Sequence, residues 1–110
     1  METSFIRVAS KNEIPNGKMK KLQLDNKEIL IANVKGSFYA IDSKCTHQGT
    51  DLSQGKLEGN ILECPKHHAK FDLTTGKVVS KPSVAFMHPN INDEKTYQVK
   101  IENEDIMVKP

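Results

Sequence analysis

Cys45-Thr46-His47 and Cys64-Pro65-Lys66-His67 are the two stretches that decide the fold of this 110-residue chain. They hold its only two cysteines, and a histidine follows closely behind each. Two thiolates and two imidazoles make a plausible four-ligand metal site. A zinc finger usually takes both cysteines from one element and both histidines from another. Here each stretch supplies one sulfur and one nitrogen, which favours a two-iron centre whose irons have different ligands.

The residues around both pairs resemble those of the Rieske [2Fe–2S] proteins. The matching text is C-T-H-Q-G at 45–49 and C-P-K-H-H-A-K-F-D-L-T-T-G-K-V at 64–78, within a resemblance that runs from about 29 to 108. It implies one [2Fe–2S] cluster, with Cys45 and Cys64 on one iron and His47 and His67 on the other. Because thiolate stabilises ferric iron, the histidine-bound iron is expected to take the electron.

The rest of the sequence predicts an all-β fold, because no stretch keeps a helical period. Apolar runs at 27–34 and 37–41, joined by Lys35-Gly36, predict one hairpin, and alternation at 97–101 and 106–108 predicts another. Tighter hairpins are expected at 57–63 and 71–79. The resemblance implies a single Rieske domain over 1–110. It would have an antiparallel β-sandwich base at about 1–42 and 83–110, with a small cluster-binding subdomain inserted at about 43–82.

Several positions depart from the high-potential Rieske proteins of respiratory complexes. Thr50 and Lys66 stand where those proteins carry two cysteines joined as a disulfide. Ala69 and Phe71 replace a serine and a tyrosine whose hydroxyl groups donate hydrogen bonds to the cluster. Such bonds raise the reduction potential by dispersing negative charge on the reduced cluster. We therefore expect a potential in the lower half of the Rieske range.

Two further departures lie close to the predicted cluster. His68 occupies a position that is commonly glycine in the family, and 83–92 looks like an insertion before the last hairpin. Pro82 is the best match to the family's proline loop, which covers the cluster. Phe86 and Met87 are expected to pack as local core; an extended cover or a partner contact is the alternative.

Composition limits the classes of function. The net charge of +2 and the scarcity of aromatic residues among the lysines do not indicate nucleic-acid binding. No apolar run is long enough to span a membrane, and the N-terminal residues lack an apolar signal region. With both cysteines assigned to metal, a cytoplasmic protein is expected. No nucleophile with its base and no phosphate-binding glycine loop is visible, so no enzyme activity is expected.

The resemblance implies a monomeric, soluble one-electron carrier. It would pass electrons from a reductase, expected to be flavin-dependent, to a terminal acceptor such as a Rieske-type oxygenase. One alternative is a permanent Rieske-like small subunit of a larger redox enzyme, as in nitrite reductases. Another is a zinc-stabilised interaction module, because zinc also accepts this ligand set.

Overall fold

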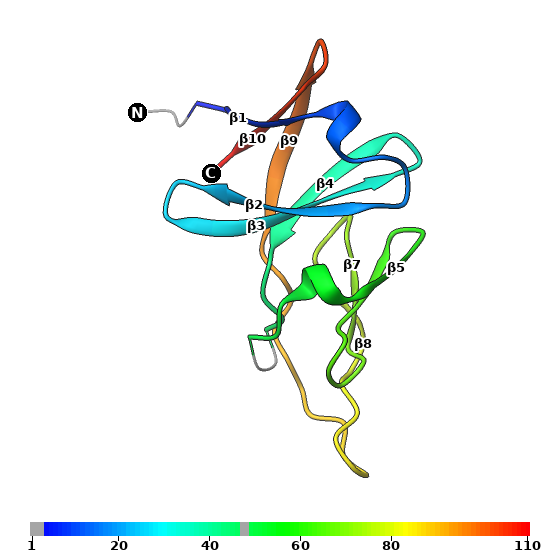
Figure 1. Cartoon of the computed structure of the whole chain (residues 1–110). Coiled ribbons are helices and arrows are strands. Elements are labelled where there is room, and N and C mark those ends of the chain that lie inside the picture. The colour runs from blue at the N-terminus through cyan, green and yellow to red at the C-terminus, as the bar shows by residue number, and fades with distance from the viewer. Residues whose placement is uncertain (1–3, 47–48) are drawn as a thin grey trace.

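The computed structural model describes residues 4–46 and 49–110, which form ten strands and two short 3-10 helices (Figure 1). The strands are β1 Ile6–Ser10, β2 Met19–Leu24, β3 Lys27–Val34, β4 Ser37–Asp42, β5 Lys56–Glu58, β6 Ile61–Glu63, β7 Lys70–Asp72, β8 Val78–Ser80, β9 Thr96–Glu102 and β10 Asp105–Lys109. The 3-10 helices are η1 Lys11–Glu13 and η2 Leu52–Gln54. The all-β prediction is confirmed, and none of the described helices is long and apolar enough to cross a membrane.

Six antiparallel strands form the larger sheet, in the order β1-β10-β9-β4-β3-β2. The sheet curls until β1 and β2, its two edges, come into contact. The face inside this curl is lined by a first core of apolar side chains, namely Ala9, Ile14, Leu24, Ile29, Ile31, Phe38, Ala40, Tyr97, Ile106 and Val108. Strands from both ends of the chain therefore build one base (Figure 1).

The four predicted hairpins are all present. Strand β3 pairs with β4 through the turn at Lys35-Gly36, where both residues have positive φ, as a two-residue hairpin turn requires. The pairs β9–β10, β5–β6 and β7–β8 are the other three. The prediction missed β2, an edge strand on which lysines interrupt the apolar alternation.

Strand β3 has a buried core on each of its faces. Ile29 and Ile31 point into the first core, while Leu30 and Ala32 point into a second core on the opposite face. Successive residues of a strand alternate between faces, so an unbroken apolar run is what a strand buried on both sides needs. This strand joins the base to the smaller sheet.

The smaller sheet has the order β5-β6-β7-β8 and lies below the base in Figure 1. Its apolar residues share the second core with β3 and β4, and both cysteines belong to that core. The buried members are Leu30, Ala32, Ile41, Cys45, Leu52, Leu62, Cys64, Ala69, Phe71 and Leu73. The cysteines are therefore placed where the two sheets meet.

The chain between β8 and β9 returns along the smaller sheet before it re-enters the base. The Glu94 N–H donates to the Gly76 carbonyl at 2.7 Å, and the Val78 N–H donates to Asp93 Oδ1 at 2.9 Å. Farther out, Phe86 and Met87 are 100% and 70% exposed, so the expectation that they form local core is wrong. They sit on a turn that projects beyond the sheet, and no other described segment covers them.

Replacing Gly76 with alanine tests the close approach of the returning chain. A Cβ at Gly76 would clash with the Glu94 carbonyl oxygen, and φ there is +78°. We expect Gly76→Ala to lower the free energy of unfolding by roughly 2–4 kcal/mol in urea titrations. Gly59→Ala is the matched control, because φ is +59° with no atom within 4 Å, and it should cost only about 1 kcal/mol. Equal losses in both variants would contradict the close approach.

Candidate metal centre

The first cysteine lies in a loop, residues 45–50, that is closed by its own backbone. The Cys45 N–H donates to the Thr50 carbonyl at 2.8 Å, and the Gly49 N–H donates to the Cys45 carbonyl at 2.8 Å. Gly49 has a φ of +69°, a conformation that glycine adopts without a steric penalty. We call these residues the first ligand loop.

The second cysteine lies in a loop, residues 64–69, with the same pattern of bonds. The Cys64 N–H donates to the Ala69 carbonyl at 2.7 Å, and the His68 N–H donates to the Cys64 carbonyl at 3.1 Å. His68 has a φ of +63° and occupies the place that Gly49 has in the first loop. The two loops thus share the same two backbone hydrogen bonds and a positive φ at the fifth residue. The second ligand loop has a histidine at this position, where a positive φ favours glycine.

A side-chain hydrogen bond joins His68 to Glu63. Its Nδ1 lies 2.7 Å from Glu63 Oε2, and this bond holds the pKa of the Glu63 carboxyl below its ordinary value. Lys70 lies 4.0 Å from the other oxygen of the same carboxylate. The side chain of His68 is 65% exposed, so it points away from the core that contains Cys64.

Three of the four predicted ligands lie in the described part of the chain, and His47 lies outside it. Cys45 and Cys64 are each 2% exposed, and His67 is half-buried with its Nδ1 atom buried. The Ser83 N–H donates to the His67 carbonyl at 2.8 Å, directly after the buried Pro82. The proline segment therefore lies against the second ligand loop; that it covers the cluster stays a prediction.

The donor atoms fit a [2Fe–2S] cluster. Within residues 4–46 and 49–110, no three or more His, Cys, Asp or Glu side chains gather around a single ion position. A two-iron cluster with two cysteines and two histidines needs only two protein ligands for each iron. Two buried sulfurs in one core, with a buried imidazole nitrogen from the second loop, suit such a cluster.

A buried carboxylate that sequence reasoning missed supports the first ligand loop. Glu94 is 4% exposed, and its Oε2 accepts the Thr46 N–H at 2.8 Å. The Thr46 hydroxyl also donates to the Asn92 carbonyl. Because the Glu94 N–H binds Gly76, this residue connects the first ligand loop to the β7–β8 turn. Nothing in the polar run around Glu94 marks it as buried.

Burial raises the pKa of the Glu94 carboxyl from its ordinary 4.5 to about 7, and the nearby Asp42 carboxylate adds to the rise. The hydrogen bond from the Thr46 N–H acts in the opposite direction, because it stabilises the ionised form. The folded protein therefore favours the protonated acid. The resulting stability is fully present below about pH 4.5 and is lost as the pH rises through about 7.

Glu94→Gln tests this titration, because glutamine keeps a carbonyl acceptor for Thr46 and cannot ionise. Between pH 5 and 8.5, the free energy of unfolding of the wild type minus that of the variant should fall by about 2 kcal/mol, after allowance for solvent screening. Urea unfolding of both proteins, followed by circular dichroism at each pH, measures the difference. A difference that stays constant with pH would contradict the raised pKa.

The backbone strain at His68 is tested by comparing two substitutions that both remove the side-chain hydrogen bond to Glu63. We expect His68→Ala to be less stable than His68→Gly by about 1 kcal/mol, because only alanine is penalised at positive φ. Thermal unfolding of the cluster-containing proteins measures the comparison. An alanine variant as stable as the glycine variant would show that the loop does not require this conformation.

Comparison with known proteins extends the sequence resemblance to nearly the whole chain. The Rieske [2Fe-2S] domain family matches residues 4–98. The ferredoxin component of the naphthalene 1,2-dioxygenase/salicylate 5-hydroxylase systems of Ralstonia sp. is 39% identical over 99% of this chain and 98% of its own. The biphenyl dioxygenase ferredoxin subunit of a Pseudomonas species is 35% identical over 96% and 91%.

A solved structure agrees with the fold. The ferredoxin of carbazole 1,9a-dioxygenase from Nocardioides aromaticivorans superposes with a TM-score of 0.83 at 26% identity, covering 98% of this chain and 99% of that one. The match includes both the base and the smaller sheet, so the fold predicted from the sequence is confirmed. Together with the buried cysteine loops, these comparisons show that the chain belongs to the Rieske [2Fe–2S] family, as a ferredoxin that carries electrons on its cluster and is not itself a catalyst.

Proposed function

We propose that Cys45 and Cys64 hold one iron of the cluster and that His47 and His67 hold the other. Two observations support this assignment: the two ligand loops share one backbone design, and each presents a buried cysteine to the same core. The buried Nδ1 of His67 is the ring nitrogen suited to bind iron. We also propose that residues 1–110 act as one domain, with the cluster bound by the part at about 43–82.

The cysteines and the histidines have different roles in electron transfer. When bound, the cluster supplies the site that stores one electron. Cys45 and Cys64 keep their sulfurs away from water, which lowers the local dielectric and favours a stable thiolate–iron bond. His67 is only half-buried, whereas both cysteines are buried, so the histidine side of the cluster is the shorter route for electrons in and out.

The partners proposed here are a flavin-dependent reductase as donor and the oxygenase of an aromatic-ring dioxygenase system as acceptor. The relatives that support this are ferredoxin components of naphthalene, dinitrotoluene and biphenyl dioxygenase systems. In the carbazole 1,9a-dioxygenase system, a ferredoxin has been solved in complex with its oxygenase. The single observation that carries the proposal is the 39% identity over almost the full length of such a ferredoxin.

A reconstituted electron-transfer assay tests this function. The purified protein is added to the reductase and oxygenase components of the source organism with NADH, and product formation by the oxygenase is followed. We expect activity that requires the protein and saturates as its concentration rises, as for a mobile carrier. Cys64→Ala, which leaves no side-chain donor atom for iron, should abolish the activity.

Stable association with a larger enzyme would contradict the carrier role. If the chain purifies in a stable one-to-one complex with a larger oxidoreductase, and added protein does not change the rate, it is a permanent subunit. Size-exclusion chromatography of the native complex, alongside the assay, distinguishes the two outcomes.

A further inference from the structure

One turn of the molecule displays apolar side chains that the fold does not use. Phe86 is 100% exposed and Met87 is 70% exposed on the segment between β8 and β9. Large apolar side chains that gather on a protruding surface mark interaction sites more often than single scattered ones do. We call residues 84–87 the apolar turn.

The backbone of the apolar turn has a defined, hydrogen-bonded conformation. Val84 and Met87 exchange two hydrogen bonds, each 2.9 Å from nitrogen to oxygen, which close a two-residue turn. Ala85, the first residue of that turn, has a φ of +55°. L-residues other than glycine, asparagine and aspartate rarely adopt this conformation, and it persists where the surroundings enforce it. The shape holds Phe86 out from the surface.

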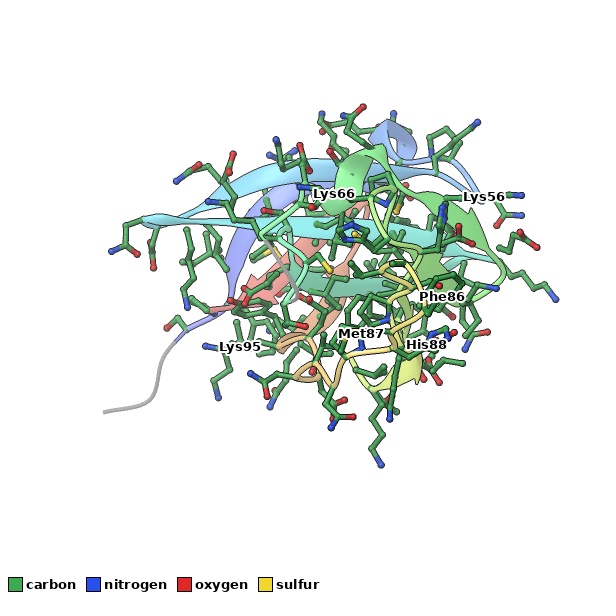
Figure 2. All side chains as sticks on the ribbon, turned by 90° about the horizontal axis from the view of Figure 1, so that it is seen from below. Lys56, Lys66, Phe86, Met87, His88 and Lys95 are labelled. Carbon is green, nitrogen blue, oxygen red and sulfur yellow. The ribbon has the colours of Figure 1, made fainter. Side chains whose placement is uncertain are left out.

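The apolar turn lies beside the second ligand loop. The Ser83 N–H, one residue before the turn, donates to the His67 carbonyl at 2.8 Å. In Figure 1 this yellow segment forms the lower end of the molecule, opposite the β9–β10 hairpin. Figure 2 views that end and shows Phe86, Met87 and His88 close together, with Lys66 of the second ligand loop above them. A partner that covers the turn would therefore lie next to His67.

Two lysines lie on the segments next to the apolar turn. Lys66 and Lys81 are exposed, and neither forms an ion pair in the part of the chain that the structure describes. Glu63, next to the second ligand loop, lies 2.7 Å from His68 Nδ1 and 4.0 Å from Lys70 Nζ, and Asp93 accepts the Val78 N–H. The complementary surface is therefore an apolar hollow with an acidic rim.

We propose that the apolar turn is the docking element for the electron-accepting oxygenase, with Phe86 and Met87 entering a hollow on that partner. The inference rests on the proposed function and goes further, because it assigns residues outside the cluster site to partner recognition. The acceptor is chosen as the occupant because an oxygenase is the partner found in complex with a ferredoxin of this fold. Lysines 66 and 81 guide the acidic rim toward His67.

Stopped-flow mixing of the reduced ferredoxin with the oxidised oxygenase of the source organism tests the proposal. The double variant Phe86→Ser/Met87→Ser removes the apolar side chains from exposed positions, so the fold should be unaffected. Ile101→Ser is the matched control, because Ile101 is also exposed, at 40%, but lies on β9 in the base. We expect the second-order rate constant to fall about tenfold for the double variant and to stay within about twofold for the control.

Parallel measurements separate a docking role from other causes. The reduction potential, the paramagnetic resonance spectrum and the rate of oxidation by ferricyanide, a small oxidant, should equal those of the wild type in both variants. A wild-type rate constant for the double variant would overturn the proposal. So would a loss confined to reduction by the reductase, or a loss of self-association with no change in the oxygenase rate. If the wild type itself fails to reduce the oxygenase, the proposed function is wrong and not only this inference.

Discussion

The closure of each ligand loop on its own cysteine is the constraint on which the rest of the structure depends. Cys45 and Cys64 each use both backbone polar groups within a six-residue loop, so their side chains can be buried without leaving amide groups unsatisfied. Burial then places both sulfurs in the core between the two sheets. Because this core is also what packs the smaller sheet onto β3 and β4, metal binding and folding of the smaller sheet should be coupled.

The same core accounts for the electronic character expected of the centre. Ala69 and Phe71 are fully buried beside the cysteines, and neither can donate a hydrogen bond from its side chain. The second ligand loop therefore packs against hydrocarbon where high-potential relatives provide hydroxyl groups. Because hydrogen bonds to a reduced cluster disperse its negative charge, we expect a low reduction potential in surroundings that lack these hydroxyl donors.

Local patterns predicted the four hairpins correctly, and they also indicated the candidate ligands, whose assignment stays a prediction. Lys35-Gly36 encodes its turn directly, and the spacing of Cys45, Cys64 and their histidines is specific enough to indicate the cluster. The pairings of β4 with β9 and of β6 with β7 join residues that no local pattern relates. These two strand pairings depend on how the whole chain packs, so sequence patterns within short segments do not predict them.

On the chain that returns before β9, burial differs from what residue type alone predicts. Glu94 was missed because a carboxylate in a polar segment predicts exposure, whereas here it binds Thr46 inside the protein. Phe86 and Met87 were expected to be buried because they are apolar, but a turn that begins at Ala85 carries them outward. Both positions lie on the returning chain before β9, where tertiary contacts outweigh residue type.

Electron paramagnetic resonance of the purified protein, before and after reduction with dithionite, tests the central claim most directly. A two-iron centre with cysteine and histidine ligands should be silent when oxidised. After reduction it should give a rhombic signal whose average g value lies below that of the free electron, in a protein that is red-brown before reduction. A colourless protein that is silent in both states and contains one zinc ion per chain would contradict the account.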